Sequence, residues 1–343
     1  MKHRTFFWFI LPTLSAMILF IALPIVSVFI QSLFVQHEQV LIISESCGPF
    51  GCTPTTSIDA EATAALREAQ PLGRFNGLGS YVDRSHLAFA ELGELWQSST
   101  GIGAFFDGIM DLKFYKALVF TLTYTFVVTP LVLLFGLAIA VGVNNLPKAM
   151  RGVAIFISLL PFLIPPIVGS MILSWMVDGE GIFGATLQIL FDDPSLSVKA
   201  STPLMWIMLM VYGVWHTLPF SFIVFYAGLQ TVPQDTMEAA KVDGANKWQS
   251  MIHIVVPHLM PLVSFVTLML LMDNFRVYEP LISFQAEAHA QSLSTFIVSD
   301  LREAGNPLYS SAGATSILTI LGVIILLTPV LIRTWRDFNR KAH

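Results

Sequence analysis

Residues 231–261 read TVPQDTMEAAKVDGANKWQSMIHIVVPHLMP, a polar stretch that lies between two long apolar runs. Each flanking run, Leu204–Leu229 and Leu259–Phe284, is long enough for a membrane-spanning helix of about 20 residues. Four further runs are as long: Phe6–Phe34, Ala117–Val143, Gly152–Val177 and Ala312–Ile332. Only helices and closed barrels satisfy every backbone group in lipid, and these runs are continuous rather than alternating. The sequence therefore predicts an all-α integral membrane protein with six transmembrane helices.

Composition separates this chain from soluble proteins. Of its 343 residues, 55% are hydrophobic and only 12% are charged, whereas about 25% is the usual charged fraction of a soluble domain. The first apolar run follows a short basic leader, but it is longer than the apolar core of about 7–15 residues in a signal peptide. It also lacks a small-x-small cleavage site, so we expect an uncleaved first transmembrane helix.

Basic residues indicate which segments face the cytoplasm, because Lys and Arg are enriched on that side. With the N-terminus inside, the short inner segments hold ten Lys and Arg, whereas the much longer outer segments hold seven. The inner ten are Lys2, Arg4, Lys148, Arg151, Lys241, Lys247, Arg333, Arg336, Arg340 and Lys341. We therefore expect cytoplasmic N- and C-termini, and short cytoplasmic helices between the fourth and fifth spans.

Three regions follow from this topology. Residues 1–34 form the first transmembrane helix, 35–116 form an extracytoplasmic loop, and 117–343 form a core of five transmembrane helices that includes the loop 231–257. The outer loop contains Cys47 and Cys52, in SESCGPFGCTP. Thiols on this side of the membrane are oxidised, so we expect a small disulfide-closed loop. No metal site is expected, because two Cys without a nearby His supply too few ligands.

Motifs of several enzyme classes are missing from the sequence. It contains no G-x-x-x-x-G-K-[ST], the phosphate-binding loop of many ATPases, no H-E-x-x-H and no G-x-S-x-G. We therefore predict no catalytic residues, no cofactor and no ATP-binding site in this chain, and no nucleic-acid partner. A conduit or carrier is the class that remains.

The opening stretch carries signals for a first short helix. Thr231 and Gln234 have the spacing of a capping box, with Pro233 in the first turn, where its missing N–H is not needed. Gly244 suits the left-handed position that ends a helix. The pattern predicts a short helix between Thr231 and Gly244.

A second short helix is predicted directly after this turn. Asn246 and Gln249 repeat the capping-box spacing. Pro257 and Pro261 follow, and we expect them to end this helix at the membrane surface. The whole stretch then forms a helix, a Gly turn and a second helix on the cytoplasmic face.

This stretch resembles a known motif. EAAKVDGANKWQSMIHIVVP (238–257) resembles the EAA loop of the permease subunits of bacterial ABC importers, in which Glu-Ala-Ala, a Gly four residues on and a closing Ile-x-x-Pro recur. FYAGLQTVPQDTMEAA (225–240) resembles the branch that imports sugars of the maltose type and glycerol phosphate. Other stretches agree: FNGLGSYV (75–82), FYKALVFTLTYT (114–125) and LLPFLIPPIVGSMILSWMVDGEGIFG (159–184). The chain departs from the family at LISFQAEAHAQSLST (281–295), where a Thr-Gly-Gly-Gly-Pro-like turn is common.

The resemblance implies an assembly in the bacterial inner (plasma) membrane. Its other members would be a second permease subunit that forms a heterodimer with this chain, two ABC ATPase subunits that bind ATP and Mg, and an extracytoplasmic solute-binding protein. The substrate would be a sugar or sugar derivative. The residues implied in coupling to the ATPase are Glu238, Ala239, Ala240, Asp243 and Gly244.

Charged residues in the predicted fifth helix are candidates for the substrate path. Asp273, Arg276 and Glu279 have the spacing i, i+3 and i+6, with Asn274 and Tyr278 beside them. Charges in hydrocarbon normally face a bundle interior or a watery cavity. These residues either line the path of a sugar, or Asp273 and Arg276 form an intrahelical pair that fixes packing.

Two features of the other helices leave alternatives open. His216, near Pro219 in the fourth helix, either faces the path or packs at a kink. Three prolines in the third helix, Pro161, Pro165 and Pro166, predict a kink or break. The runner-up function is a secondary transporter driven by an ion gradient, with Asp273 and Glu279 as ion sites, although no inverted repeat supports it. A membrane scaffold without transport is a third reading.

Overall fold

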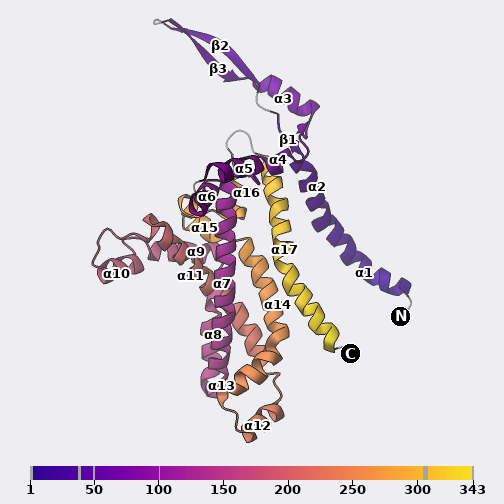
Figure 1. Cartoon of the computed structure of the whole chain (residues 1–343), viewed down its shortest axis with the longest axis vertical. Coiled ribbons are helices and arrows are strands. Elements are labelled where there is room, and N and C mark those ends of the chain that lie inside the picture. The colour runs from indigo at the N-terminus through magenta and orange to yellow at the C-terminus, as the bar shows by residue number, and fades with distance from the viewer. Residues whose placement is uncertain (1–2, 38–39, 49–50, 100, 304–307, 342–343) are drawn as a thin grey trace. The chain divides into compact units, whose positions relative to one another are not determined.

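The computed structural model describes residues 3–37, 40–48, 51–99, 101–303 and 308–341, in which helices predominate (Figure 1). The chain divides into two compact units, which are described separately. The first unit comprises Met1–Tyr115 and Phe296–Thr319, and the second comprises Lys116–Thr295 and Ile320–His343.

Candidate membrane spans account for most of the helical structure. Within the described residues, five helices are long and apolar enough to cross a membrane, or six if the bent pair α8 and α9 is one span. This range includes the six predicted. The helices concerned are α1 and α2 (His3–Met17 and Leu23–Ser32, joined by the π-turn Ile18–Ala22), α7 (Lys113–Asn144), α8 (Lys148–Leu163), α9 (Pro166–Met176), α11 (Thr202–Leu229), α13 and α14 (Lys247–Ser250 and Val256–Phe275, joined by the π-turn Met251–Val255) and α17 (Tyr309–Lys341).

Shorter elements connect these spans. The first unit adds α3 (Ala60–Ala69), α4 (Gly79–Val82), α5 (Phe89–Ser98), α6 (Ile102–Met110) and strands β1 (Phe34–Val35), β2 (Leu41–Gly48), β3 (Gly51–Ile58) and β4 (Arg74–Phe75). The second adds α10 (Ile182–Leu190), α12 (Gln234–Val242), α15 (Glu279–Ser283) and two 3-10 turns, Val198–Ala200 and Ala286–Ala288. Helix α16 (Leu293–Leu301) begins in the second unit and ends in the first.

The expectation of an all-α protein is wrong for the outer loop. Strands β1 and β4 form one antiparallel pair, and β2 and β3 form another. The sequence of β2 and β3 is rich in Ile, Thr and Ser, and only two residues, flanked by glycines, separate the two stretches, which favours a hairpin over a helix. The composition of the apolar runs gave no information about this polar segment.

A disulfide between Cys47 and Cys52 remains a prediction, which the backbone register supports. The two residues are direct partners across β2 and β3, whereas their side chains lie outside the described residues. Directly opposed residues have Cα atoms about 4.5–5.5 Å apart, within the range that a disulfide bridges. Mass spectrometry of the unreduced peptide 45–54 is expected to show a species lighter by the two thiol hydrogens. Quantitative alkylation of both thiols in unreduced protein would contradict the bond.

The predicted break in the third span is confirmed. Helices α8 and α9 meet at an angle of 94°. Pro165 and Pro166 have no N–H, so the carbonyls of Pro161 and Phe162 lose their helical partners. The Tyr212 hydroxyl, from α11, donates to the Pro166 carbonyl at 2.6 Å and ties the break to the bundle.

The boundaries of the predicted fifth span are wrong at both ends. The span begins at Lys247 rather than at the predicted Leu259. The predicted short helix after Asn246 does not end at Pro257 and Pro261 but continues through both prolines into the span. A π-turn precedes Pro257, and Val256 N–H bonds back to Met251, which lets the chain pass the proline without an α-helical clash.

At its other end, the same helix stops at Phe275 rather than at the predicted Phe284. The ring of Pro280 would meet the carbonyl of Arg276 in a continuous helix, and proline has no N–H to donate to it. A separate short helix, α15, therefore begins at Glu279.

Close packing holds α7, α11 and α14 together in the second unit. Its buried core includes Phe120 and Val128 of α7, Phe222 of α11 and Val266 of α14. Asn274 is 3% exposed and donates a hydrogen bond to Thr129 at 3.0 Å, which links α14 to α7. This frame positions both candidate sites described below.

Candidate functional site: coupling segment and membrane cavity

The turn between α12 and α13 has the left-handed geometry that the sequence predicts. Gly244 has φ +81°, a conformation that costs a β-branched residue much more than glycine. Its N–H bonds to the Lys241 carbonyl at 3.1 Å, and Ala245 N–H bonds to the Ala240 carbonyl at 2.9 Å. These two bonds form a Schellman motif, which satisfies the last carbonyls of α12. Residues 231–257 thus contain a rigid turn rather than an irregular loop.

Only one of the two predicted capping boxes forms. Asn246 Oδ1 accepts from Gln249 N–H at 2.8 Å, and Gln249 Oε1 accepts from Asn246 N–H at 2.9 Å, so the cap of α13 is confirmed. The box at Thr231 is wrong, because Pro233 occupies the N-cap of α12. Thr231 instead continues the last turn of α11, where its N–H bonds to the Gly228 carbonyl at 3.0 Å.

The five residues implied in ATPase coupling lie together on α12 and the turn that follows. Four of them, Glu238, Ala239, Asp243 and Gly244, are exposed, and Ala240 is half-buried. Helix α12 lies at one end of the second unit and α15 at the other (Figure 1). The segment therefore offers an accessible surface, and the role of these residues remains a prediction.

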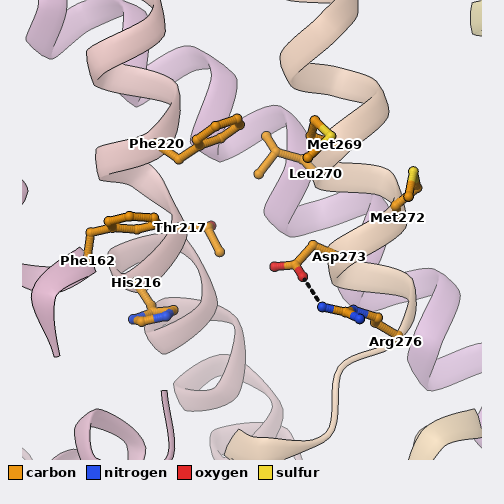
Figure 2. A pocket seen from close by; sticks show the side chains of 9 residues that line it. All are labelled: Phe162, His216, Thr217, Phe220, Met269, Leu270, Met272, Asp273 and Arg276. Carbon is orange, nitrogen blue, oxygen red and sulfur yellow. Dashed lines mark hydrogen bonds and ion pairs between the residues drawn. The ribbon is translucent and has the colours of Figure 1, made fainter. Parts of the chain in front are cut away.

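A cavity of about 420 Å³ lies between α8, α11 and α14 (Figure 2). Figure 2 shows the Asp273 carboxylate facing the side of α11 that carries His216 and Thr217. Arg276 Nη2 lies 3.3 Å from Asp273 Oδ1, and both side chains are more than half exposed. The lining residues are Phe162, His216, Thr217, Phe220, Met269, Leu270, Met272, Asp273 and Arg276.

His216 adds an unusual polar atom to this wall. Its Nδ1 is buried and has no hydrogen-bond partner within the described part of the chain. Its ring stacks on Tyr212, with centroids 5.6 Å apart and planes 7° apart. The cavity wall thus combines aromatic side chains, which can contact C–H groups, with an ion pair, which can form hydrogen bonds with hydroxyl groups.

The structure separates the six predicted path residues. Three of them, His216, Asp273 and Arg276, line the cavity. Asn274 is instead buried against α7, because adjacent helical residues point about 100° apart. Tyr278 and Glu279 follow the end of α14 and are not among the lining residues. The predicted one-helix series Asp273, Arg276 and Glu279 is therefore wrong, although its first two members do form a pair.

The sequence prediction missed the rest of the wall, which is mostly apolar: Phe162, Thr217, Phe220, Met269, Leu270 and Met272. On α11 and α14 these residues recur with helical spacing around the predicted His216 and Asp273. The sequence does not distinguish these positions from the rest of each helix, because nearly every neighbouring position is also apolar.

Comparison with known families decides between the remaining classes. Residues 99–335 match the family of binding-protein-dependent transport system inner membrane components. The chain belongs to this family. Residues 35–98, which include the β2–β3 hairpin, lie outside the matched part.

Relatives of this inner membrane component are ABC transporter permeases. The probable ABC transporter permease protein YesP of Bacillus subtilis (strain 168) is 30% identical over 244 residues, which are 68% of this chain and 77% of the relative. The trehalose/maltose transport system permease protein MalF of Thermococcus litoralis is 31% identical over 49% of this chain. The trehalose transport system permease protein SugA of Mycobacterium tuberculosis is 29% identical over 52%. The matches span 56% and 57% of these last two relatives, little more than half of their length.

A solved structure shares the fold. The crystal structure of a bacterial ABC transporter involved in the import of the acidic polysaccharide alginate contains a chain that matches 76% of this chain and 87% of its own length, with TM-score 0.58 and 20% identity. A second crystal structure, of a bacterial alginate ABC transporter in complex with an alginate pentasaccharide-bound periplasmic protein, matches with TM-score 0.56 and 19% identity.

These matches identify the chain as a multi-pass inner-membrane transport component whose relatives are permease subunits of sugar ABC importers. An ion-gradient-driven carrier is not favoured, because the family transports with a binding protein. The sequence-based resemblance to ABC permeases is confirmed.

Proposed function

We propose that this chain is the transmembrane subunit of an ATP-driven importer for a sugar or sugar derivative, and that it contributes one wall of the translocation path. One observation carries the proposal: α11 and α14, which line the cavity, are the helices joined by the segment α12–α13. A force applied to α12 therefore reaches the cavity through two continuous helices.

The family and the names of its relatives support the following proposed partners. A second, different permease subunit would complete the path. Two ABC ATPase subunits would bind ATP and Mg and dock on α12, and an extracytoplasmic binding protein would deliver the sugar. In this assembly both chain termini and α12 face the cytoplasm, in keeping with the distribution of Lys and Arg. This chain needs no ATP-binding site of its own.

The cavity offers groups suited to a carbohydrate. Phe162 and Phe220 supply apolar faces, while Asp273 and Arg276 supply hydrogen-bonding groups. A sugar presents C–H patches and hydroxyls to such a wall.

Reconstitution tests the proposal. The chain would be purified with its partners and placed in liposomes with the binding protein outside. Uptake of the sugar found on the copurified binding protein is expected to require ATP, and the chain alone should transport nothing. Uptake by the isolated chain under an ion gradient would contradict the proposal.

A further inference from the structure

A side-chain contact joins the two ends of residues 231–257, the segment proposed above to couple to the ATPase (the coupling segment). Thr231 Oγ1, just after α11, lies 3.0 Å from His258 Nε2 of α14. The same hydroxyl donates to the Gly228 carbonyl at 2.8 Å. A hydroxyl has one hydrogen, so Thr231 must accept the bond from His258, whose Nε2 carries the hydrogen. The bond therefore forms with the neutral Nε2–H tautomer and with the charged ring.

The backbone packs closely beside this bond. Gly228 is buried in the last turn of α11, and a Cβ at this position would overlap the side chains of Leu259 and Leu262 on α14. Leu259 is itself fully buried. Helices α11 and α14 therefore meet within one turn of the Thr231–His258 bond, and the coupling segment is a loop whose ends are held together.

A second bond holds the neighbouring helix at the same level. Gln230 Nε2 donates to Asn144 Oδ1 at 3.0 Å, which connects the end of α11 to the end of α7. The start of the coupling segment is thus attached to both α7 and α14.

We propose that Thr231 and His258 form a clamp that makes α11 and α14 move together when α12 is pushed. The clamp rests on the proposed function, since it transmits force from the ATPase to the cavity. Without this bond, the end of α11 and the start of α14 could move apart when α12 is pushed. Less of the movement of α12 would then reach the cavity. Thr231 and His258 act through the two helices and touch no solute, so they are positioning residues.

The test uses a reporter in the cavity wall and needs no known solute. Met269→Cys in the full complex is alkylated with a maleimide, with and without ATP plus vanadate, and labelling at this site is followed by mass spectrometry. In the otherwise unmodified complex we expect the two rates to differ by about fivefold or more, the lower end of typical allosteric coupling. With Thr231→Val added, we expect the ratio to fall toward unity while ATP hydrolysis continues.

Matched variants separate the clamp from general damage. Thr231→Ser and His258→Gln keep the acceptor and an N–H donor and are expected to retain the ratio. Thr334→Val removes a hydroxyl that donates to Val330 within α17 at 2.8 Å, and should also leave it unchanged. The effects of Thr231→Val and His258→Leu on the labelling ratio should be non-additive when the two are combined, because each variant removes the same hydrogen bond.

The outcomes distinguish this inference from the proposed function. If ATP and vanadate leave the labelling rate unchanged in the complex without clamp variants, both proposals are overturned. If that complex responds and Thr231→Val and His258→Leu respond equally well, the clamp alone is overturned. Loss of the response in Thr231→Ser and His258→Gln would also overturn it, because these variants keep the hydrogen bond.

Discussion

Replacing Gly244 with Val is expected to reduce ATP-driven uptake by at least about tenfold while the protein still inserts into the membrane. Gly244 has φ +81°, and within the described residues no atom beyond Gly244 and its two chain neighbours lies within 4 Å of the position that a Cβ would take. The cost is therefore in the backbone itself, of the order of 1–3 kcal/mol for a β-branched residue in this conformation. Since about 1.4 kcal/mol is a factor of ten in an equilibrium constant, this cost would lower the ratio of the native turn to its alternatives by about fivefold to a hundredfold.

The consequence for transport follows from the position of this turn. Loss of the left-handed residue breaks the bonds from Gly244 to Lys241 and from Ala245 to Ala240, so α12 loses its fixed angle to α13. No membrane helix changes, which is why insertion should persist. Measured uptake should fall together with the amount of ATPase that copurifies.

Two variants make this result specific. Gly244→Asn should keep most of the activity, because Asn tolerates the left-handed region. Gly152→Val is a matched control, since Gly152 lies inside α8, also has open space around its Cβ position and has no positive φ. Normal uptake by Gly244→Val at equal membrane levels would contradict a coupling role for the turn.

The local structure of residues 231–257 could be predicted in part because its signals are local. The cap of α13 depends on two residues three positions apart, and the turn depends on a single glycine, so neither needs information from the rest of the fold. Thr231 has the same local pattern but failed, because it continues the hydrogen bonding of α11. Where a long helix ends directly before a capping motif, the capping residue can instead extend the hydrogen bonding of that helix.

The cavity could be predicted only in part, for a physical reason. In an apolar helix, a charged residue is expected on the face that avoids lipid, and Asp273 does line the cavity. Nothing in the sequence marks the end of α14 at Phe275 except Pro280, four residues after Arg276. The π-turn before Pro257 also has no clear sequence signal, so the predicted helix began too late.

Variants of the Asp273–Arg276 pair separate a packing role from contact with solute. The two side chains are 57% and 76% exposed, and an exposed ion pair contributes only about 0–1 kcal/mol to stability. Arg276→Gln should therefore change the melting temperature of the complex little. We nevertheless expect about a tenfold loss of uptake, because Arg276 lines the cavity and its guanidinium has N–H donors beyond the one that faces Asp273.

The double variant gives the decisive comparison. If Arg276 only neutralises Asp273, then Asp273→Asn combined with Arg276→Gln should restore the uptake lost in each single variant. Contact with solute predicts instead that the double variant stays impaired, and that Arg276→Lys shifts the preference between neutral and acidic sugars, since a lysine cannot reproduce the planar fork. Lys199→Gln is the control: it breaks the 2.6 Å pair with Asp178, which lies outside the cavity lining, and should leave preference unchanged. Full rescue with unaltered preference would reduce the pair to a structural contact.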